Sequence, residues 1–169
     1  MEKLIEKLHA YLQFPEVKKL LTNHSGSDGT NPDRHSQHVI EGYKIIEAYT
    51  YGQDVARLDE AVRLFHRIQT SDMKYLQALA LYGAAVAHGM ADRFNEAQEA
   101  IAQLKGLSLT IGTDYSDEIE DLKHYASEEM LVDLKQGYER LHPGQELPKP
   151  SGCMVLILIL GSASLLMFL

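Results

Sequence analysis

The strongest restriction on the fold comes from a segment that occurs twice, 36 residues apart. Arg57-Leu-Asp-Glu-Ala-Val-Arg-Leu-Phe-His-Arg-Ile68 aligns with Arg93-Phe-Asn-Glu-Ala-Gln-Glu-Ala-Ile-Ala-Gln-Leu104. Both copies carry Arg, a large apolar residue, Asp or Asn, Glu and Ala, followed by apolar residues at helical spacing. The helices that precede the two copies align at the same offset, so that Ile45 pairs with Leu81. A period in the mid-thirties is typical of stacked helix–turn–helix units, so the sequence predicts antiparallel helix pairs.

The second copy and the helix before it resemble the tetratricopeptide repeat (TPR) family. The residues that carry this resemblance hold the family's large, small and turn positions: Leu81, Ala84, Ala85, His88, Asp92, Phe94, Ala97, Ile101 and Leu104. The first copy departs from the pattern at Tyr49, where the family has Gly or Ala, and neither copy ends in the usual Pro. The resemblance implies repeat units at about 39–70 and 74–106 in an all-α, right-handed stack with a groove that binds a protein partner.

Further helices are expected on both sides of the repeats. Leu4, Ile5, Leu8 and Leu12 share one face of a first helix, and Pro15 opens a short second one. A polar loop follows, then a helix from about 33 to 51. After an extended linker at 107–112, apolar residues at intervals of three and four predict a capping helix over about 115–141. The predicted fold is therefore an all-α domain of about six to seven helices over residues 1–141.

The end of the sequence is an uncharged apolar segment, residues 153–169. As a helix it would reach roughly 25 Å, the short end of what crosses a bilayer. We expect a linker at 142–152 and a single transmembrane helix inserted after synthesis, with the domain on the cytoplasmic side. The residues expected to anchor it are Cys153, Leu156, Leu160, Leu165 and Leu169. The alternatives are a terminal helix or strand buried in the core, or a tail packed in a groove of its own domain.

Charge excludes some partners. The formal net charge is −8, and nucleic-acid binding needs clustered Lys and Arg, so a nucleic-acid partner is not expected. An acidic surface is also repelled by anionic lipid heads, so membrane attachment would depend on the apolar tail. Cys153 is the single cysteine, which rules out an intrachain disulfide. We expect no cofactor.

Two groups of polar residues were weighed as chemical sites. Histidines and acids gather before and within the start of the third predicted helix: His24, Asp28, Asp33, His35 and His38. Imidazole with carboxylate is a zinc-type ligand set, but the spacing matches no metal motif, and capping and loop roles explain these residues as well. Four acids near the first helix pair, Glu47, Asp54, Asp59 and Glu60, are interpreted as a solvated face. No catalytic residue is predicted.

Tyrosines are the best candidates for partner binding. Five of them fall on the first helices of the repeats, which by the TPR resemblance line the concave face: Tyr43, Tyr49, Tyr51, Tyr75 and Tyr82. Tyrosine is favoured at binding surfaces because it combines apolar area with a polar tip. We expect two of the five to be exposed on the groove, and take Tyr43, Tyr51, Tyr75 and Tyr82 as candidates.

These features favour a non-enzymatic adaptor that recruits a protein partner at a membrane surface. Two alternatives stay open. One is a metal-dependent enzyme built on the region of His24, His35 and His38. The other is a homo-oligomer assembled by the tail, where the small residues 161–164 would let two helices approach.

Overall fold

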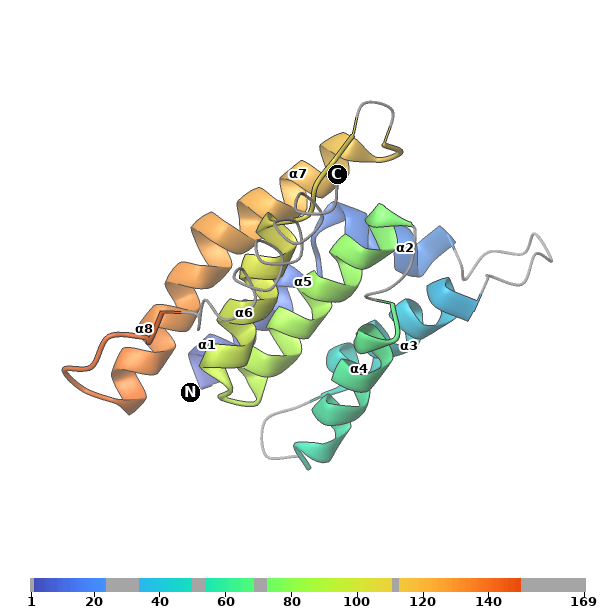
Figure 1. Cartoon of the computed structure of the whole chain (residues 1–169). Coiled ribbons are helices and arrows are strands. Elements are labelled where there is room, and N and C mark those ends of the chain that lie inside the picture. Colours follow the sequence, from blue (N-terminus) through green and yellow to red (C-terminus); the bar gives the residue numbers. More distant parts are fainter. Residues whose placement is uncertain (1, 24–33, 50–53, 69–72, 111–112, 150–169) are drawn as a thin grey trace, which may run out of the picture.

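The computed structural model describes residues 2–23, 34–49, 54–68, 73–110 and 113–149. All regular secondary structure in these ranges is helical, which confirms the all-α prediction (Figure 1). The helices in chain order are α1 (Glu2–Tyr11), α2 (Pro15–Asn23), α3 (Arg34–Ala48), α4 (Ala56–His66), α5 (Lys74–Met90), α6 (Phe94–Lys105), α7 (Ser116–Tyr125), the π-helical η1 (Ala126–Met130) and α8 (Leu131–Leu141).

Helix α5 is the centre of the fold. It contacts α1, α3, α4, α6 and α7, and Figure 1 shows it between the α3–α4 pair and α6. Every residue from 76 to 90 is buried. Almost all of them are Ala, Leu, Gly, Val, Met or Tyr, and a helix that is apolar on all sides can be stable only inside the molecule.

The contact between α3, α4 and α5 is built around Phe65 of α4. Its ring lies against Gly42 of α3 and Gly83 of α5, where an added Cβ would come within 2.5 Å of a ring carbon in either case. Tyr43 packs edge-on against the same ring, with centroids 5.4 Å apart. Two glycines on neighbouring helices therefore provide the space that one large side chain fills, which brings the three backbones close together.

The chain reverses between α5 and α6 at Asp92, the residue expected at the turn. Asp92 adopts a left-handed conformation (φ 57°), and the Arg93 amide donates to the His88 carbonyl at 2.9 Å. This reversal lets α6 pack back along α5. Ala85 and Ala97, predicted as small residues of a close helix contact, are both fully buried.

Helices α7, η1 and α8 run without interruption over residues 116–141, the region expected to hold the last helix. The predicted apolar positions are buried as far as α8: Ile119, Leu122, Ala126, Met130 and Leu134. The π-helical turn adds a residue to the helix at this point. Leu141 continues the apolar spacing but is 41% exposed. The row of buried apolar side chains along α7, η1 and α8 therefore ends before α8 itself ends.

Residues 107–110 have no regular structure, as predicted for an extended linker. Lys123 of α7 fixes this segment, because its Nζ donates to the Leu107 carbonyl at 2.8 Å. Within the described ranges, no helix is both long enough and apolar enough to cross a membrane. The predicted anchor, residues 153–169, lies outside those ranges.

Candidate functional site

A pocket of about 630 Å³ opens where α2, α3, the start of α5 and the segment before α7 meet. We call it the tyrosine pocket. Its lining includes Lys19 and Leu20 of α2, Ser36 of α3, residues 73–76, Thr110, and residues 113–115. These segments are far apart in the sequence, and the contacts of α2 with α3 and of α7 with α5 bring them together.

Two tyrosines form the aromatic part of the tyrosine pocket. The rings of Tyr75 and Tyr115 stack with centroids 4.6 Å apart and planes inclined by 24°. Tyr75 is half-buried, and burial raises the pKa of its hydroxyl to about 12, with further contributions from the negative charges of Glu16 and Glu118. The Tyr75 phenol is therefore neutral at physiological pH, and the pair of rings offers apolar area with polar edges.

Apolar side chains at the rim of this pocket reach solvent. Met73 is 46% exposed and Tyr115 is 52% exposed. Lys19, Lys74 and Asp114 add charges of both signs to the lining. Exposed apolar surface beside a concave site with a few polar groups is the usual composition of a binding site.

The structure corrects two of the tyrosine candidates. Tyr43 and Tyr82 are fully buried. The Tyr43 hydroxyl donates to the Leu79 carbonyl at 2.6 Å, and the Tyr82 hydroxyl donates to the Tyr11 carbonyl at 3.3 Å. Tyr43 of α3 and Tyr82 of α5 therefore hold helices together and are closed off from solvent. Tyr49 is also buried, with 3% exposure.

Of the remaining candidates, Tyr75 lines the tyrosine pocket, and Tyr51 lies outside the described residues. Met73 and Tyr115 were not among the candidates expected from the sequence. A weak signal existed for Tyr115, since it follows Asp114 as the first residue of the helix predicted over about 115–141, a position where a large aromatic residue is unusual.

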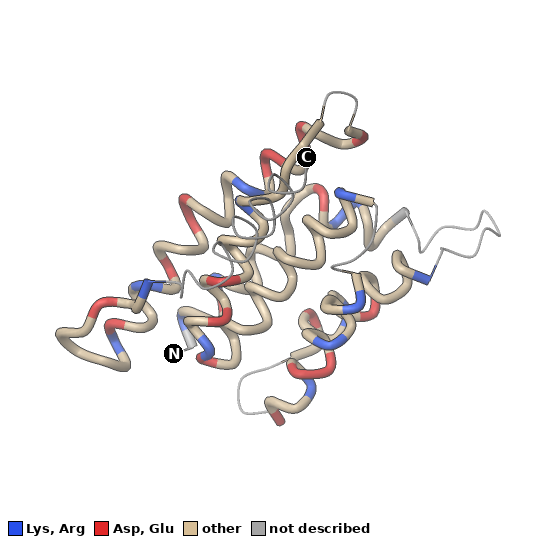
Figure 2. The backbone as a smooth tube through the Cα atoms, in the orientation of Figure 1, with Lys and Arg blue, Asp and Glu red and all other residues tan. Residues whose placement is uncertain are grey.

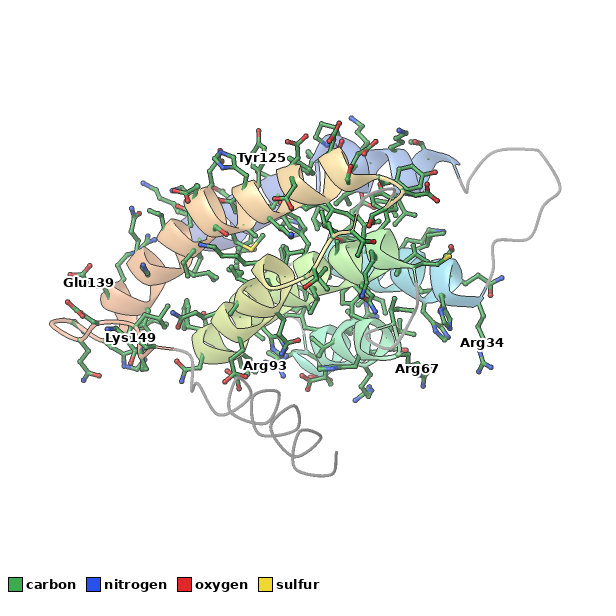
Figure 3. The ribbon with its side chains drawn as sticks, turned by 45° about the horizontal axis from the view of Figure 1, so that its top comes forward. Arg34, Arg67, Arg93, Tyr125, Glu139 and Lys149 are labelled. Carbon is green, nitrogen blue, oxygen red and sulfur yellow. The ribbon has the colours of Figure 1, made fainter. Side chains whose placement is uncertain are left out.

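Of the weak metal candidates, only His35 and His38 fall within the described residues, and no metal-binding group is found around them there. His35 and His38 lie near the start of α3, and His24 falls outside the described ranges. Burial lowers the pKa of His38, and the positive charges of Arg67 and Arg34 lower it further, with Glu41 opposing them. Both arginines lie at the same end of the molecule in Figure 3. The same charges would oppose a metal cation. In the part of the chain that the structure describes, no three His, Cys, Asp or Glu side chains form a metal-binding group.

The four acids near the first helix pair do not act as a unit. Asp59 forms an ion pair with Arg93, which joins α4 to the start of α6. Glu47, Asp54 and Glu60 are exposed, as the interpretation of a solvated face predicts. Glu60 also borders a second, charged hollow of about 430 Å³ between α3 and α4, together with Glu41, Lys44 and Arg57.

Two further polar groups are buried away from the tyrosine pocket. Asp133 of α8 accepts hydrogen bonds from Lys7 and Tyr11 of α1. His88 near the end of α5 has a pKa lowered to about 4, chiefly by burial and then by the positive charge of Arg93. Both groups lie at contacts between helices, so we treat them as parts of the fold.

No protein-family model matches this chain, and neither a curated protein nor a solved structure matches it. The fold and the pocket thus define an all-helical domain with an aromatic pocket on its side, and its function has to be argued from that site.

Proposed function

We propose that this chain is a non-enzymatic adaptor that binds a protein partner in the tyrosine pocket while residues 153–169 hold the domain at a membrane. The observation that carries the proposal is the solvent-exposed apolar rim of this pocket. Large exposed hydrophobic side chains in the described residues are Val55, Met73, Tyr115, Val132 and Leu141. Two of these five lie together at the tyrosine pocket, next to the half-buried Tyr75, whereas Val55 precedes α4 and both Val132 and Leu141 lie on α8.

The size and composition of the pocket fit a protein ligand. A volume of about 630 Å³ lies within the usual range of ligand sites and can hold one or two side chains of a bound segment. Tyr and Met are enriched at protein interfaces because they offer large apolar contacts that adapt to a partner. Lys19, Lys74 and Asp114 at the same site would orient that segment.

We also propose that α3–α6 are two TPR-like helix pairs. Consecutive helices pack on one another from α3 to α6. Phe65 contacts both Gly42 and Gly83, so the second helix of one pair reaches the first helices of both pairs. This is the nearest-neighbour packing on which stacked repeats depend.

A peptide selection tests the binding proposal. The full-length chain in dodecyl maltoside micelles would be used to select from a random dodecapeptide display library, and the affinities of selected peptides would be measured by fluorescence anisotropy. We expect Met73→Ser to weaken binding about ten-fold, because a buried side chain of this size contributes on the order of 1.5–3 kcal/mol.

Val132→Ser is the matched control, since Val132 is equally exposed at 46% but lies on α8. It should leave the affinity unchanged. Selected peptides that bind the Met73→Ser protein as tightly as the unaltered chain, or a selection that yields no binder, would contradict the proposal.

A further inference from the structure

Tyr115 has a backbone conformation that a residue of its size rarely adopts. Its φ and ψ are 61° and 34°, in the left-handed region. Its side chain is 52% exposed, yet the ring is fixed by stacking on Tyr75. Backbone strain of this kind is concentrated at functional sites and ligand contacts. The strained conformation presents an ordered aromatic surface at the rim of the tyrosine pocket.

Acidic residues flank this ring. Asp114 precedes Tyr115 and lines the pocket, while Asp117 and Glu118 follow it in the first turn of α7. Acids in a first turn also stabilise the helix dipole, but Asp114 lies outside the helix. Glu118 and Glu16 of α2 both act on the Tyr75 hydroxyl. Negative charge from α2 and from α7 therefore acts on the Tyr75 hydroxyl, while Lys19 and Lys74 line the same pocket.

Nearby lysines are engaged elsewhere or come from other walls of the pocket. Lys123 of α7 donates to the Leu107 carbonyl and to Glu120, both at 2.8 Å. Lys74 of α5 donates to Gln77 at 3.3 Å. The positive charge closest along α7 is thus bonded to Glu120. Asp114 lines the pocket, and Asp117 is exposed two residues after Tyr115 in the chain.

We propose that Tyr115 and the acids that flank it bind an arginine side chain of the protein partner. This inference rests on the proposed function and adds the chemistry that the partner must carry. The guanidinium would stack on the face of the Tyr115 ring turned away from Tyr75 and pair with Asp117 or Glu118. A guanidinium is planar, so it can stack on an aromatic ring and bind carboxylates in a forked geometry at the same time. A lysine ammonium can form the ion pair but cannot stack in this way.

The net charge of the whole chain also favours a partner that carries a basic residue. The net charge is −8, and Figure 2 shows acidic positions spaced along α7 and α8. A field of this sign accelerates the approach of a basic segment and opposes an acidic one. The aromatic ring beside the acids then supplies a contact that a general acidic surface lacks.

The test is the composition of the selected dodecapeptides and the behaviour of the best of them. We expect arginine to be enriched in peptides selected on the full-length chain. In a synthetic copy of the tightest binder, replacing its arginine by lysine should weaken binding about two-fold to five-fold. Replacing it by glutamine should weaken binding about ten-fold at low ionic strength, because the ion pair is lost as well.

Substitutions in the protein locate the effect. Asp117→Asn with Glu118→Gln should weaken binding about ten-fold and reduce its salt dependence. Glu139→Gln with Glu146→Gln is the control, because it changes the net charge equally at two exposed positions. Figure 3 places Glu139 near the end of α8, far from the start of α7. That pair should have little effect. Tyr115→Asn keeps a residue that tolerates the left-handed conformation, so it should weaken binding while the protein stays folded by circular dichroism.

The outcomes separate this inference from the proposed function. Peptides that lack arginine, need Met73 and ignore the Asp117 and Glu118 substitutions would overturn the arginine site and leave the adaptor proposal standing. Arginine peptides weakened equally by the Glu139 and Glu146 substitutions would show general attraction to an acidic protein, which also overturns the site. A selection with no binder that depends on the pocket would overturn both proposals.

Discussion

Phe65 fills a space that two glycines leave open. Gly42 and Gly83 approach the ring from α3 and α5, and the same ring contacts Tyr43. A ring enclosed in this way cannot move aside for a new atom, because protein interiors are close-packed. The ordinary preference of helices for alanine over glycine should therefore be reversed at these positions.

We expect Gly83→Ala to lower the free energy of unfolding by about 1–3 kcal/mol, although alanine is intrinsically the better helix former by about 1 kcal/mol. The added Cβ would lie 2.5 Å from Cζ of Phe65. Urea unfolding of the full-length chain in dodecyl maltoside, followed by circular dichroism, measures the change. In a Phe65→Leu background the clash is relieved, so Gly83→Ala should become neutral or stabilising. Equal destabilisation in both backgrounds would show that Phe65 is not the cause.

His88 should make stability depend on pH. Its pKa in the folded protein is lowered to about 4, against about 6.5 in an unfolded chain. Between these values the unfolded state binds a proton that the folded state does not, so stability falls as pH falls through that window. From pH 7.5 to pH 5.5 this contributes a loss of about 1.4 kcal/mol. Urea titrations at pH 7.5 and pH 5.5 measure this contribution as the difference in pH dependence between the unaltered chain and His88→Gln. A pH dependence that is the same with and without His88 would rule this residue out.

Between elements, the contact of α1 with α8 combines the packing of Leu4 on Gly137 with one buried carboxylate. Asp133 accepts from Lys7 at one oxygen and from the Tyr11 hydroxyl at the other, at 2.7 Å for the second bond. The side chain of Asp133 is 12% exposed, whereas that of Lys7 is 53% exposed. Solvent therefore screens the ion pair, and the neutral hydrogen-bond donor holds the carboxylate on its buried side.

We expect Tyr11→Phe to lower the free energy of unfolding by about 1.5–3 kcal/mol, because it leaves a buried charged acceptor without that bond. Lys7→Met should cost less than about 1 kcal/mol, since its ammonium is mostly solvated. Both values come from the same urea unfolding measurement. A larger loss for Lys7→Met than for Tyr11→Phe would mean that the ion pair, and not the tyrosine, fixes α1 on α8.

Helix positions were largely predictable from the sequence, because apolar residues recur at helical spacing wherever a helix has one buried face. Ile119, Leu122 and Leu134 illustrate this, and each of them is fully buried. The prediction weakened on α5, which is buried on all sides. There the pattern could not show that Tyr82 faces the core, and on α3 it did not show that Tyr43 is buried between helices, so both were partner-binding candidates.

The tyrosine pocket was much less predictable than the helices. It joins residues near 19, 75 and 115, and no local pattern reports a contact over such separations. Tyr75 was identified only by its chemical type and its place in a repeat. Tyr115 lies just before a helix in a strained conformation that depends on tertiary packing, and the stacking partner that explains it is 40 residues away in the sequence.

For the molecule as a whole, charge and the apolar tail have opposite effects at a membrane. Acidic residues outnumber basic ones by 24 to 16, and Figure 2 shows several of the acids along α7 and α8. Such a surface is repelled by anionic lipid heads. Attachment would therefore need the apolar segment 153–169, and a single charge within that segment should be enough to abolish it.

We expect Leu160→Arg to release the full-length chain from membranes. The ten Leu, Ile, Val and Phe residues of the segment favour insertion by about 3–6 kcal/mol in total, and one arginine near the centre of the segment costs about 2.5–3.5 kcal/mol in addition to the lost leucine. Membranes from expressing cells would be washed with carbonate at high pH, and the protein in pellet and supernatant compared. Val132→Arg, the same kind of change at an exposed position of α8, should stay in the pellet with the unaltered chain. An unaltered chain that carbonate extracts completely would contradict the anchor, because a peripheral protein is released by this treatment and a spanning helix is not. Release of both variants would instead show that an added arginine disrupts attachment wherever it is placed, and would leave no special role for residues 153–169.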